Sequence, residues 1–212
     1  AHGATGHNAG QITSYFERSL YDIADEFGLE MAVDGQKAVE SAWGLLDEII
    51  AEAQLQTPLY RFTGYAGFSS LEQVVQHLKN NRCRVLGGSP TESIVIAKEW
   101  EGLKDIPKEY SDLYTVLNHK DLLALLETDN HDYIAALSYQ KGCTNSALFS
   151  EELIGYLIAK YPKRFSFYEG SPVSVVRLKE KKGILEVLSH RVEAKEVVLC
   201  TNGFESFKII NE

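Results

Sequence analysis

Apolar residues recur every three or four positions in several stretches of the chain, and this spacing is typical of amphipathic helices. The predicted helices cover residues 12–28, 34–55, 69–82, 119–128 and 148–162. Gly28 is a natural stop for the first helix, and Asp34 is a suitable N-cap for the second. Ser69 or Ser70 caps the third helix, with Glu72 closing a capping box. The first two helices are expected to pair as a helical hairpin.

Runs rich in β-branched and aromatic residues lie between and after these helices. Residues 59–68 predict a short strand or an aromatic turn, 93–100 a strand or alternatively a helix, and 133–146 a strand that runs into a glycine turn. Four strand-like runs then follow, at residues 164–170, 173–180, 183–190 and 191–203. The segment "EVVLC" (196–200) is continuously apolar, as expected of a strand covered on both faces. The chain is therefore predicted to be an α+β protein, with a mixed or antiparallel sheet flanked by helices.

Composition narrows the classes of partner. The 212 residues are 44% hydrophobic and carry a formal net charge of −9, which argues against nucleic acid and anionic membranes as partners. No apolar run has the length of a transmembrane segment, and no signal peptide opens the chain. The three cysteines are far apart and form no Cys-x-x-Cys pair, so we expect reduced thiols in a cytoplasmic protein.

Two glycine-containing loops are candidate ligand loops. "GATGHNAGQ" (3–11) has three glycines, which let backbone N–H groups approach a phosphate or a ring edge. "CTNGF" (200–204) follows the apolar run 196–200, at the place where α/β sheets bind ligands. Such loops are more often plain turns than ligand sites. Their order in the chain, with "SPVSVV" (171–176) between them, is a more specific signal than each loop alone.

This order resembles the middle of an FAD-dependent oxidoreductase of the D-amino acid oxidase family, which includes glycine oxidase, sarcosine oxidase, dimethylglycine dehydrogenase and γ-glutamylputrescine oxidase. "TGHNAGQ" (5–11) stands where the family has a Ser-Gly-Arg-Asn-Gly-Gly loop against the flavin. "ELIGYLIAKYPKRFSFYEGSPVSVV" (152–176) is similar to the second cofactor-binding stretch, and "VVLCTNGF" (197–204) to the closing strand and loop. The chain contains no GxGxxG, and only eight residues follow "TNGF". We therefore expect an interior fragment that lacks the N-terminal GxGxxG unit and the C-terminal part.

The resemblance implies three regions. Residues 1–58 would hold the flavin-proximal loop and the helical hairpin, residues 59–147 a substrate-domain-like segment, and residues 148–212 a helix and strands of the FAD-binding α/β domain. By the same resemblance, the cofactor-binding residues are Gly6, His7, Asn8, Ala9, Gly10, Val173, Thr201, Asn202 and Gly203. The loop residues would lie near the pyrophosphate and isoalloxazine, Val173 would meet the adenine through its backbone, and the last three would approach the ribose and diphosphate.

His7 has two alternative roles under this resemblance. Dimethylglycine-dehydrogenase-like members carry His-x-Ala-Gly, which "HNAG" (7–10) matches, and their histidine holds the flavin covalently through its 8α-methyl group. Neutral imidazole is a competent nucleophile for such a bond. The alternative is a histidine that donates a hydrogen bond to a phosphate oxygen.

The expected function is the oxidation of a small-molecule amine or amino acid by hydride transfer to FAD. No catalytic residue can be named from the sequence, and no histidine pair has metal-ligand spacing. Tyr60, Phe62, Tyr65 and Phe68 line a substrate pocket or, more commonly for such aromatics, belong to the core. Two alternatives remain: a non-catalytic binding or interaction domain on the same scaffold, and one chain of a split flavoenzyme.

Overall fold

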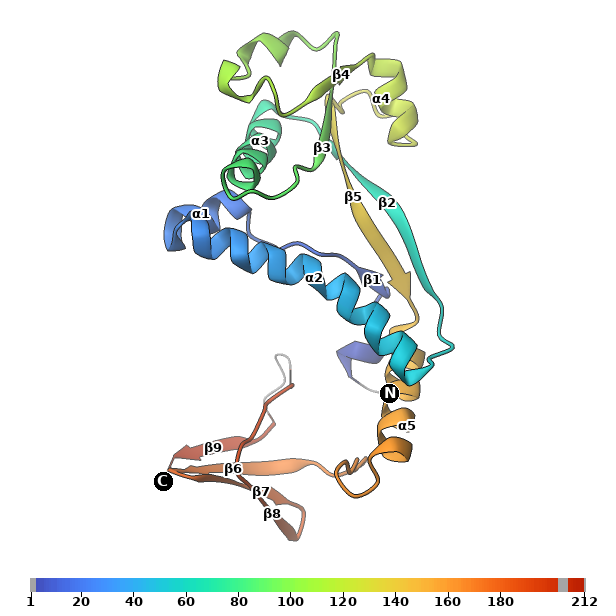
Figure 1. The fold of residues 1–212 in the computed structure, drawn as a ribbon, viewed down its shortest axis with the longest axis vertical. Coiled ribbons are helices and arrows are strands. Elements are labelled where there is room, and N and C mark those ends of the chain that lie inside the picture. Colours follow the sequence, from blue (N-terminus) through green and yellow to red (C-terminus); the bar gives the residue numbers. More distant parts are fainter. Residues whose placement is uncertain (1–2, 202–205, 212) are drawn as a thin grey trace. The chain divides into compact units, whose positions relative to one another are not determined.

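The computed structural model describes residues 3–201 and 206–211, and these fold into two compact units (Figure 1). The central unit comprises Asn8–Phe149. The terminal unit comprises Ala1–His7 together with Ser150–Glu212. Each unit contains one sheet, and helices and strands are mixed along the chain, so the predicted α+β class is confirmed. The sequence analysis treats residues 1–58 and 59–147 as separate regions. In the structure, nearly all of both belong to the central unit.

The described helices are α1 (Leu20–Phe27), α2 (Leu29–Ala53), α3 (Leu71–Leu86), α4 (His119–Leu125) and α5 (Ser146–Lys160), and the 3-10 turns are η1 (Ala4–Gly6), η2 (Glu101–Asp105) and η3 (Lys108–Tyr110). The strands are β1 (Gln11–Ile12), β2 (Leu59–Phe68), β3 (Ser93–Ala97), β4 (Thr115–Leu117), β5 (Ala135–Thr144), β6 (Val173–Lys179), β7 (Lys182–Val187), β8 (His190–Ala194) and β9 (Lys208–Asn211).

Strand β5 organises the sheet of the central unit. Its whole length pairs antiparallel with β2, from Leu59 opposite Thr144 to Phe68 opposite Ala135. Its other edge is shared, because β3 pairs with residues 135–138 and β1 pairs with residues 142–143. Strand β4 extends the sheet beyond β3 in a parallel register. The sheet is therefore mixed, as predicted.

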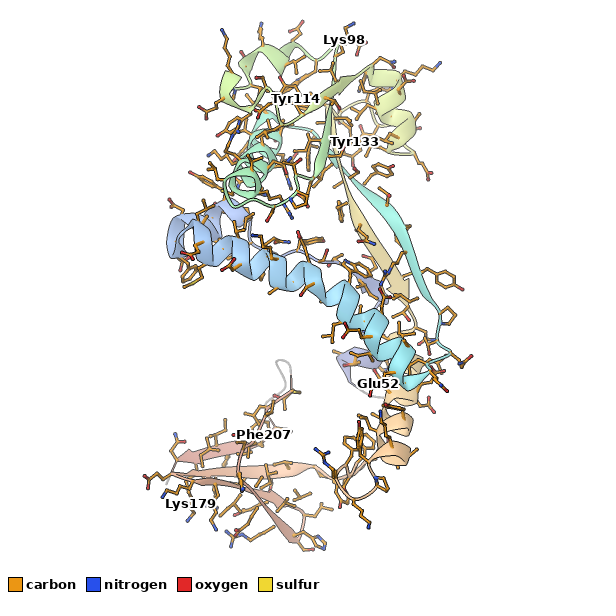
Figure 2. The ribbon with its side chains drawn as sticks, viewed as in Figure 1. Glu52, Lys98, Tyr114, Tyr133, Lys179 and Phe207 are labelled. Atoms are coloured by element: carbon orange, nitrogen blue, oxygen red, sulfur yellow. The ribbon has the colours of Figure 1, made fainter. Side chains whose placement is uncertain are left out.

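Two hydrophobic clusters cover opposite faces of this sheet at the end where β3 and β4 lie. Alternate residues of β3 and β5 join Val74 and Leu78 of α3 in the larger cluster, whose strand members are Ile94, Ile96, Ala135 and Leu137. The intervening residues Ala97 and Ala136 pack with Leu122 of α4 instead. Because both faces are covered, "SIVIA" and "IAAL" read as continuous apolar runs rather than alternating ones. Figure 2 labels Tyr114, which packs against the larger cluster at this end of the sheet.

The first predicted helix is shorter than its apolar spacing indicates. Helix α1 begins at Leu20, where the Ser19 hydroxyl accepts a hydrogen bond from the Asp22 N–H at 3.1 Å. Upstream, Gln11 and Ile12 pair with β5, and these interstrand bonds are incompatible with helix over the same residues. Gly28 ends α1 as predicted, with φ of +88°. Helix α2 then starts at once at Leu29, so Asp34 is not its N-cap.

The predicted cap of α3 is confirmed at Ser70, but the residue that completes the motif is different. The Ser70 hydroxyl accepts a hydrogen bond from the Gln73 N–H at 3.3 Å. The Gln73 side chain, rather than that of Glu72, accepts the Ser69 N–H at 2.9 Å. A glutamine amide serves because Gln73 occupies the third helical position, whose side chain reaches back to the chain before the helix.

The sheet of the terminal unit has the order β8-β7-β6-β9. β6, β7 and β8 are antiparallel neighbours, and β9 lies parallel to β6. Two strand predictions are wrong here. Residues 164–170 form turns and extended chain, and residues 196–200 form no strand. β9 takes the edge of β6, residues 196–200 join no ladder among the described residues, and Val198 is 81% exposed.

Within the described ranges, no helix has both the length and the apolar character that crossing a membrane requires.

Candidate functional site

The predicted loop of residues 6–10 is divided between the two units. Gly6 and His7 belong to the terminal unit and close the 3-10 turn η1. The Gly6 N–H donates to the Gly3 carbonyl and the His7 N–H to the Ala4 carbonyl, each at 3.1 Å. These two backbone donors are therefore already bonded within the loop. The His7 side chain is exposed.

Asn8, Ala9 and Gly10 belong to the central unit, where Asn8 and Gly10 hold the chain against β5. The Asn8 amide oxygen accepts hydrogen bonds from the Gly10 N–H at 2.7 Å and from the Ser146 hydroxyl at 3.1 Å. Gly10 has φ of +65°, and a Cβ at this position would lie 2.0 Å from the Thr144 carbonyl oxygen. Glycine is required here for close backbone approach, which the sequence predicted, but the partner is β5. Ala9 is exposed.

A cavity of about 560 Å³ in the terminal unit brings other predicted residues together. Val173 at the start of β6 and Thr201 after the apolar run both line it, although they are 28 positions apart in the sequence. Gly3, Ala4 and Thr5 line it from the N-terminal loop, next to Gly6 and His7. The other lining residues are Val176, Leu185, Val197, Val198, Leu199, Cys200, Ser206 and Phe207. Asn202 and Gly203 lie outside the described residues.

Val173 lies at an interrupted part of its sheet. It pairs with Val187 of β7, and a bulge at Ser174 separates this pair from the next, Val175 with Glu186. On the other edge of β6, the ladder with β9 begins only at Val175. Val173 therefore stands beyond the end of the β6–β9 ladder.

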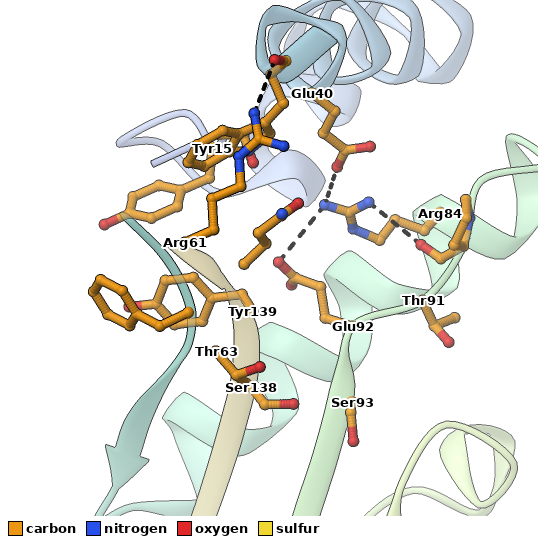
Figure 3. Close-up of a pocket in the computed structure, with 15 residues that line it drawn as sticks. Tyr15, Glu40, Arg61, Thr63, Arg84, Thr91, Glu92, Ser93, Ser138 and Tyr139 are labelled. Carbon is orange, nitrogen blue, oxygen red and sulfur yellow. Dashed lines mark hydrogen bonds and ion pairs between the residues drawn. The ribbon is translucent and has the colours of Figure 1, made fainter. Parts of the chain in front are cut away.

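A second cavity, of about 710 Å³, lies wholly in the central unit (Figure 3). Its walls come from α2, β2, β5, the segment before α1, and the connection from α3 into β3. Arg61, Arg84, Glu40 and Glu92 supply charged side chains, and Tyr15, Trp43 and Tyr139 supply aromatic ones. The remaining lining residues are Ser14, Phe62, Thr63, Pro90, Thr91, Ser93, Ser138 and Gln140.

Arg84 is the central charge of this cavity and is almost fully buried, with 8% of its side chain exposed. Its Nη2 lies 2.7 Å from Glu40 Oε1 and 3.6 Å from Glu92 Oε1, and its Nη1 donates to the Pro90 carbonyl at 3.3 Å. The buried Gln36 amide also donates to Glu40 Oε1, at 2.9 Å. Helices α2 and α3 are thus joined through one guanidinium.

Glu92 is the carboxylate of this group with the fewest contacts. Burial raises the pKa of the Glu92 carboxyl above its ordinary value, while Arg84 lowers it and Glu40 raises it further. Among the described residues, its carboxylate accepts no hydrogen bond, since the Arg84 ion pair at 3.6 Å is too long for one. Its backbone is fixed by the buried Asn81 amide, which accepts from the Glu92 N–H at 2.9 Å and donates to the Glu92 carbonyl at 2.8 Å.

Most aromatic residues of the cavity are not those singled out in the sequence. The rings of Tyr15 and Tyr139 meet edge to face with centroids 5.8 Å apart. Of the four predicted aromatics, only Phe62 lines this cavity. Tyr60 and Tyr65 are 63% and 42% exposed, and Phe68 is buried in the core. Tyr15 and Tyr139 are 124 positions apart, so only the sheet's neighbouring segments bring them together.

A smaller cavity of about 310 Å³ shares Tyr15, Arg84, Glu92 and Tyr139 with the larger one. His77 lines it and stacks on Phe68, with ring centroids 4.4 Å apart. Burial lowers the pKa of His77, because a desolvated imidazolium is disfavoured. Its Nδ1 has no hydrogen-bond partner among the described residues.

No protein-family model, curated protein or solved structure matches this chain. Over residues 3–201 and 206–211, histidine, cysteine and acidic side chains do not gather in threes as metal ligands would. The three thiols are free, with Cys83 buried and Cys200 exposed. Function is therefore inferred from the cavities of the two units.

Proposed function

We propose that the chain is part of a cytoplasmic FAD-dependent oxidoreductase that oxidises an amine or amino acid. One observation carries this proposal: Val173 and Thr201, which the sequence assigned to one cofactor site from two distant segments, line the same cavity, together with Gly3, Ala4 and Thr5 just before the predicted loop residues 6–10. Its volume of about 560 Å³ is within the usual range for small-molecule sites.

The lining residues fit one half of the cofactor better than the other. Valine, leucine and phenylalanine side chains with the hydroxyls of Thr5, Thr201 and Ser206 suit an adenine ring and a ribose. No charged side chain lines the cavity within the described residues, and the N–H groups of Gly6 and His7 are already bonded. These residues therefore favour the adenosine moiety, and a diphosphate would need donors from elsewhere.

Bound flavin would supply the hydride acceptor. The contribution of this chain is to hold the adenosine end between β6 and the 197–201 segment. The central unit contributes the larger polar cavity, which has the volume and the charges to hold a small amine or amino acid.

The test uses the purified chain and adenosine as the probe, followed by amide chemical shifts. We expect adenosine at millimolar concentration to shift the resonances of Val173, Leu185 and Thr201. Val173→Trp should abolish these shifts because the indole fills the cavity. Val192→Trp, at a half-exposed position of β8, is the matched control and should leave them unchanged.

Absence of any shift around Val173 would overturn the adenosine assignment. FAD itself should bind no tighter than about micromolar, since the chain has no GxGxxG unit to cradle the pyrophosphate. Tight stoichiometric FAD binding would contradict that expectation. Binding of other small apolar molecules in preference to adenosine would favour the alternative of a non-catalytic binding domain.

A further inference from the structure

Strand β5 is left unpaired over a short stretch of one edge. On that edge β3 pairs with residues 135–138 and β1 with residues 142–143, so residues 139–141 have no strand beside them in the described part of the chain. We call this uncovered edge the β5 gap. The central cavity of about 710 Å³ lies at the β5 gap, because Ser93 at the start of β3 and Ser14 just after β1 line it together with residues 138–140 (Figure 3).

The backbone groups of Gln140 point into the β5 gap. The Ala97 N–H donates to the carbonyl of Ile134, which directly precedes β5, at 2.8 Å, and the Thr144 N–H donates to the Gly10 carbonyl at 3.0 Å. In an antiparallel ladder, every second residue directs its N–H and carbonyl toward the same neighbour. Both bonds therefore assign the even-numbered residues of β5 to the edge shared by β3 and β1. Gln140 is the even-numbered residue of the gap, and its two backbone groups have no partner on that edge among the described residues.

Two buried amide side chains keep the chain's own segments out of the β5 gap. Continuing the register of β1 would bring Ser14 opposite Gln140, but the Ser14 carbonyl accepts a hydrogen bond from the buried Gln36 amide at 2.9 Å. Extending β3 backwards would begin with Glu92, whose N–H and carbonyl are bonded to the fully buried Asn81 amide at 2.9 and 2.8 Å. Neither neighbouring segment therefore reaches the free groups of Gln140.

The charges of the central cavity are already matched. Its lining carries two arginines and two glutamates, and Arg84 is shared by both glutamates. Arg61 lies 2.7 Å from Asp47 Oδ1, and the Lys141 ammonium beside the gap lies 5.0 Å from the centroid of the Tyr139 ring. The groups that still lack a partner are thus the neutral N–H and carbonyl of the strand edge, which favours a neutral ligand with complementary amide groups.

We propose that the central cavity binds a short extended peptide, which fills the β5 gap antiparallel to β5 and exchanges two backbone hydrogen bonds with Gln140. Adding a strand to an open sheet edge is a common way of recognising peptides. The gap is three residues long, or about 10 Å of strand, and β1 and β3 bound it at its two ends, so the ligand is a peptide of about three residues. This inference goes beyond the proposed oxidation and needs no flavin.

The first test is amide exchange of the purified chain without flavin. The Gln140 amide should exchange fast, whereas the Ser138 and Gly142 amides should be protected by their pairing with β3 and β1. The probe is a neutral capped peptide, N-acetyl-trialanine N-methylamide, which should slow the exchange of the Gln140 amide. Protection of the Gln140 amide in the free chain would overturn the proposal, because the chain's own segments would then fill the gap.

The second test asks whether backbone pairing holds the peptide. An analogue with an ester in place of the central peptide N–H has nearly the same shape but cannot donate to the Gln140 carbonyl. It should bind about threefold to tenfold more weakly by calorimetry, the range of one lost neutral hydrogen bond. Equal binding of the peptide and the ester analogue would overturn the proposal.

Two variants locate the site on the chain. Gln140→Pro removes the N–H that faces the cavity and should abolish binding, with amide exchange of β2 as the check of folding. Thr63→Trp leaves the backbone unchanged and should also abolish binding, because Thr63 lines the cavity and an indole fills it. Leu45→Trp, at an exposed position of α2 outside the lining, is the matched control and should bind the peptide normally. Normal binding by Thr63→Trp would overturn the proposal, and since adenosine and flavin are absent throughout, failure here leaves the adenosine assignment interpretable.

Discussion

The two units differ in how their strands are covered. In the central unit, Leu78, Ile94, Ile96 and Leu122 are at most 2% exposed, because α3 and α4 cover the two faces of the sheet. In the described part of the terminal unit, only Val176 and Ile184 are buried hydrophobic residues. The β8 and β9 positions Val192 and Ile209 are about half exposed, at 48% and 49%. Figure 2 shows Lys179, the last residue of β6, on this sheet.

This difference shows that strand patterns of similar hydrophobicity do not produce equal cores. A four-stranded sheet covered by no helix buries little apolar surface and gains little stability from it. A sheet between two helices buries apolar surface on both faces and gains stability from each. The central unit should therefore carry most of the free energy of unfolding, and substitutions in the two units should differ accordingly.

The largest expected effect is a truncation in the core of the central unit. Leu78→Ala should lower the free energy of unfolding by about 3–4 kcal/mol, because a fully buried leucine leaves a cavity. Val192→Ala on β8 should change it by less than about 0.5 kcal/mol. Both tryptophans, Trp43 and Trp100, lie in the central unit, so their emission during urea unfolding reports Leu78→Ala. Amide exchange of β6–β8 reports Val192→Ala.

A loss below about 1 kcal/mol for Leu78→Ala would mean that the site collapses around the smaller side chain. The contrast between the two units would then be smaller than their burial indicates.

The second largest effect is expected for ion pairs. Removing one from the central unit should lower the free energy of unfolding more than removing one from the terminal unit. Arg84→Met removes a buried guanidinium, leaves the partly buried carboxylates of Glu40 and Glu92 without their shared cation, and should cost about 3 kcal/mol. Arg177→Met removes a partly exposed pair with Glu186 between β6 and β7, at 2.8 Å, in which neither side chain is deeply buried, and should cost about 1 kcal/mol or less. The urea midpoint measures the effect of Arg84→Met, and amide exchange of β6–β8 measures the effect of Arg177→Met.

The matched rescue is Arg84→Met combined with Glu40→Gln. It should recover part of the loss, because it removes one of the two unpaired carboxylates. Equal costs for Arg84→Met and Arg177→Met would contradict the assignment of Arg84 as a buried charge.

The smallest expected effect is on the pH dependence of stability, to which Glu92 in the central unit and Glu193 in the terminal unit should contribute with opposite signs. The folded-state pKa of Glu92 is raised, chiefly by burial, so the folded state holds the proton to higher pH than the unfolded state. Stability contributed by this group falls as pH rises from the ordinary value of 4.5 through the raised value. The folded-state pKa of Glu193 is lowered, first by a hydrogen bond from Lys182, so its contribution is present above 4.5 and is lost as pH falls through the lowered value.

Urea midpoints of the wild type, Glu92→Gln and Glu193→Gln across this pH range isolate the two groups. The advantage of the wild type over Glu92→Gln should shrink as pH rises, and its advantage over Glu193→Gln should grow. Parallel curves for the wild type and Glu92→Gln would show that Glu92 titrates alike in the folded and unfolded states.

Much of the local structure was predictable from the sequence. Helix α3, the Ser70 cap, strands β2, β3 and β5, and the stop at Gly28 all follow from apolar spacing and from side chains within a few residues. The errors occur where a distant segment competes. Residues 11 and 12 have helical spacing but pair with residues 142 and 143 of β5. The apolar run 196–200 reads as a buried strand, but the edge of β6 is taken by β9.

The candidate sites divide in the same way. The requirement for glycine at position 10 was readable from the sequence, but not that the backbone it accommodates is that of Thr144. Val173 and Thr201 were assigned to one site through their order in the chain, and they line one cavity. Arg84 and Glu92 were not assigned at all, because an arginine near a helix end and a glutamate in a loop are usually solvated.

The sequence by itself determined the α+β class, the positions of most helices and strands, and the acidic balance of the chain. Helical hydrogen bonds, caps and glycine turns join residues at most a few positions apart, so a local pattern is sufficient to specify them. Only the tertiary structure decided which strands pair with β5 and which apolar run stays exposed. It also decided that α2, α3 and the segment before β3 bring Glu40, Arg84 and Glu92 together. Strand pairing and burial join residues tens of positions apart, and which of several competing partners wins depends on the packing of the whole unit.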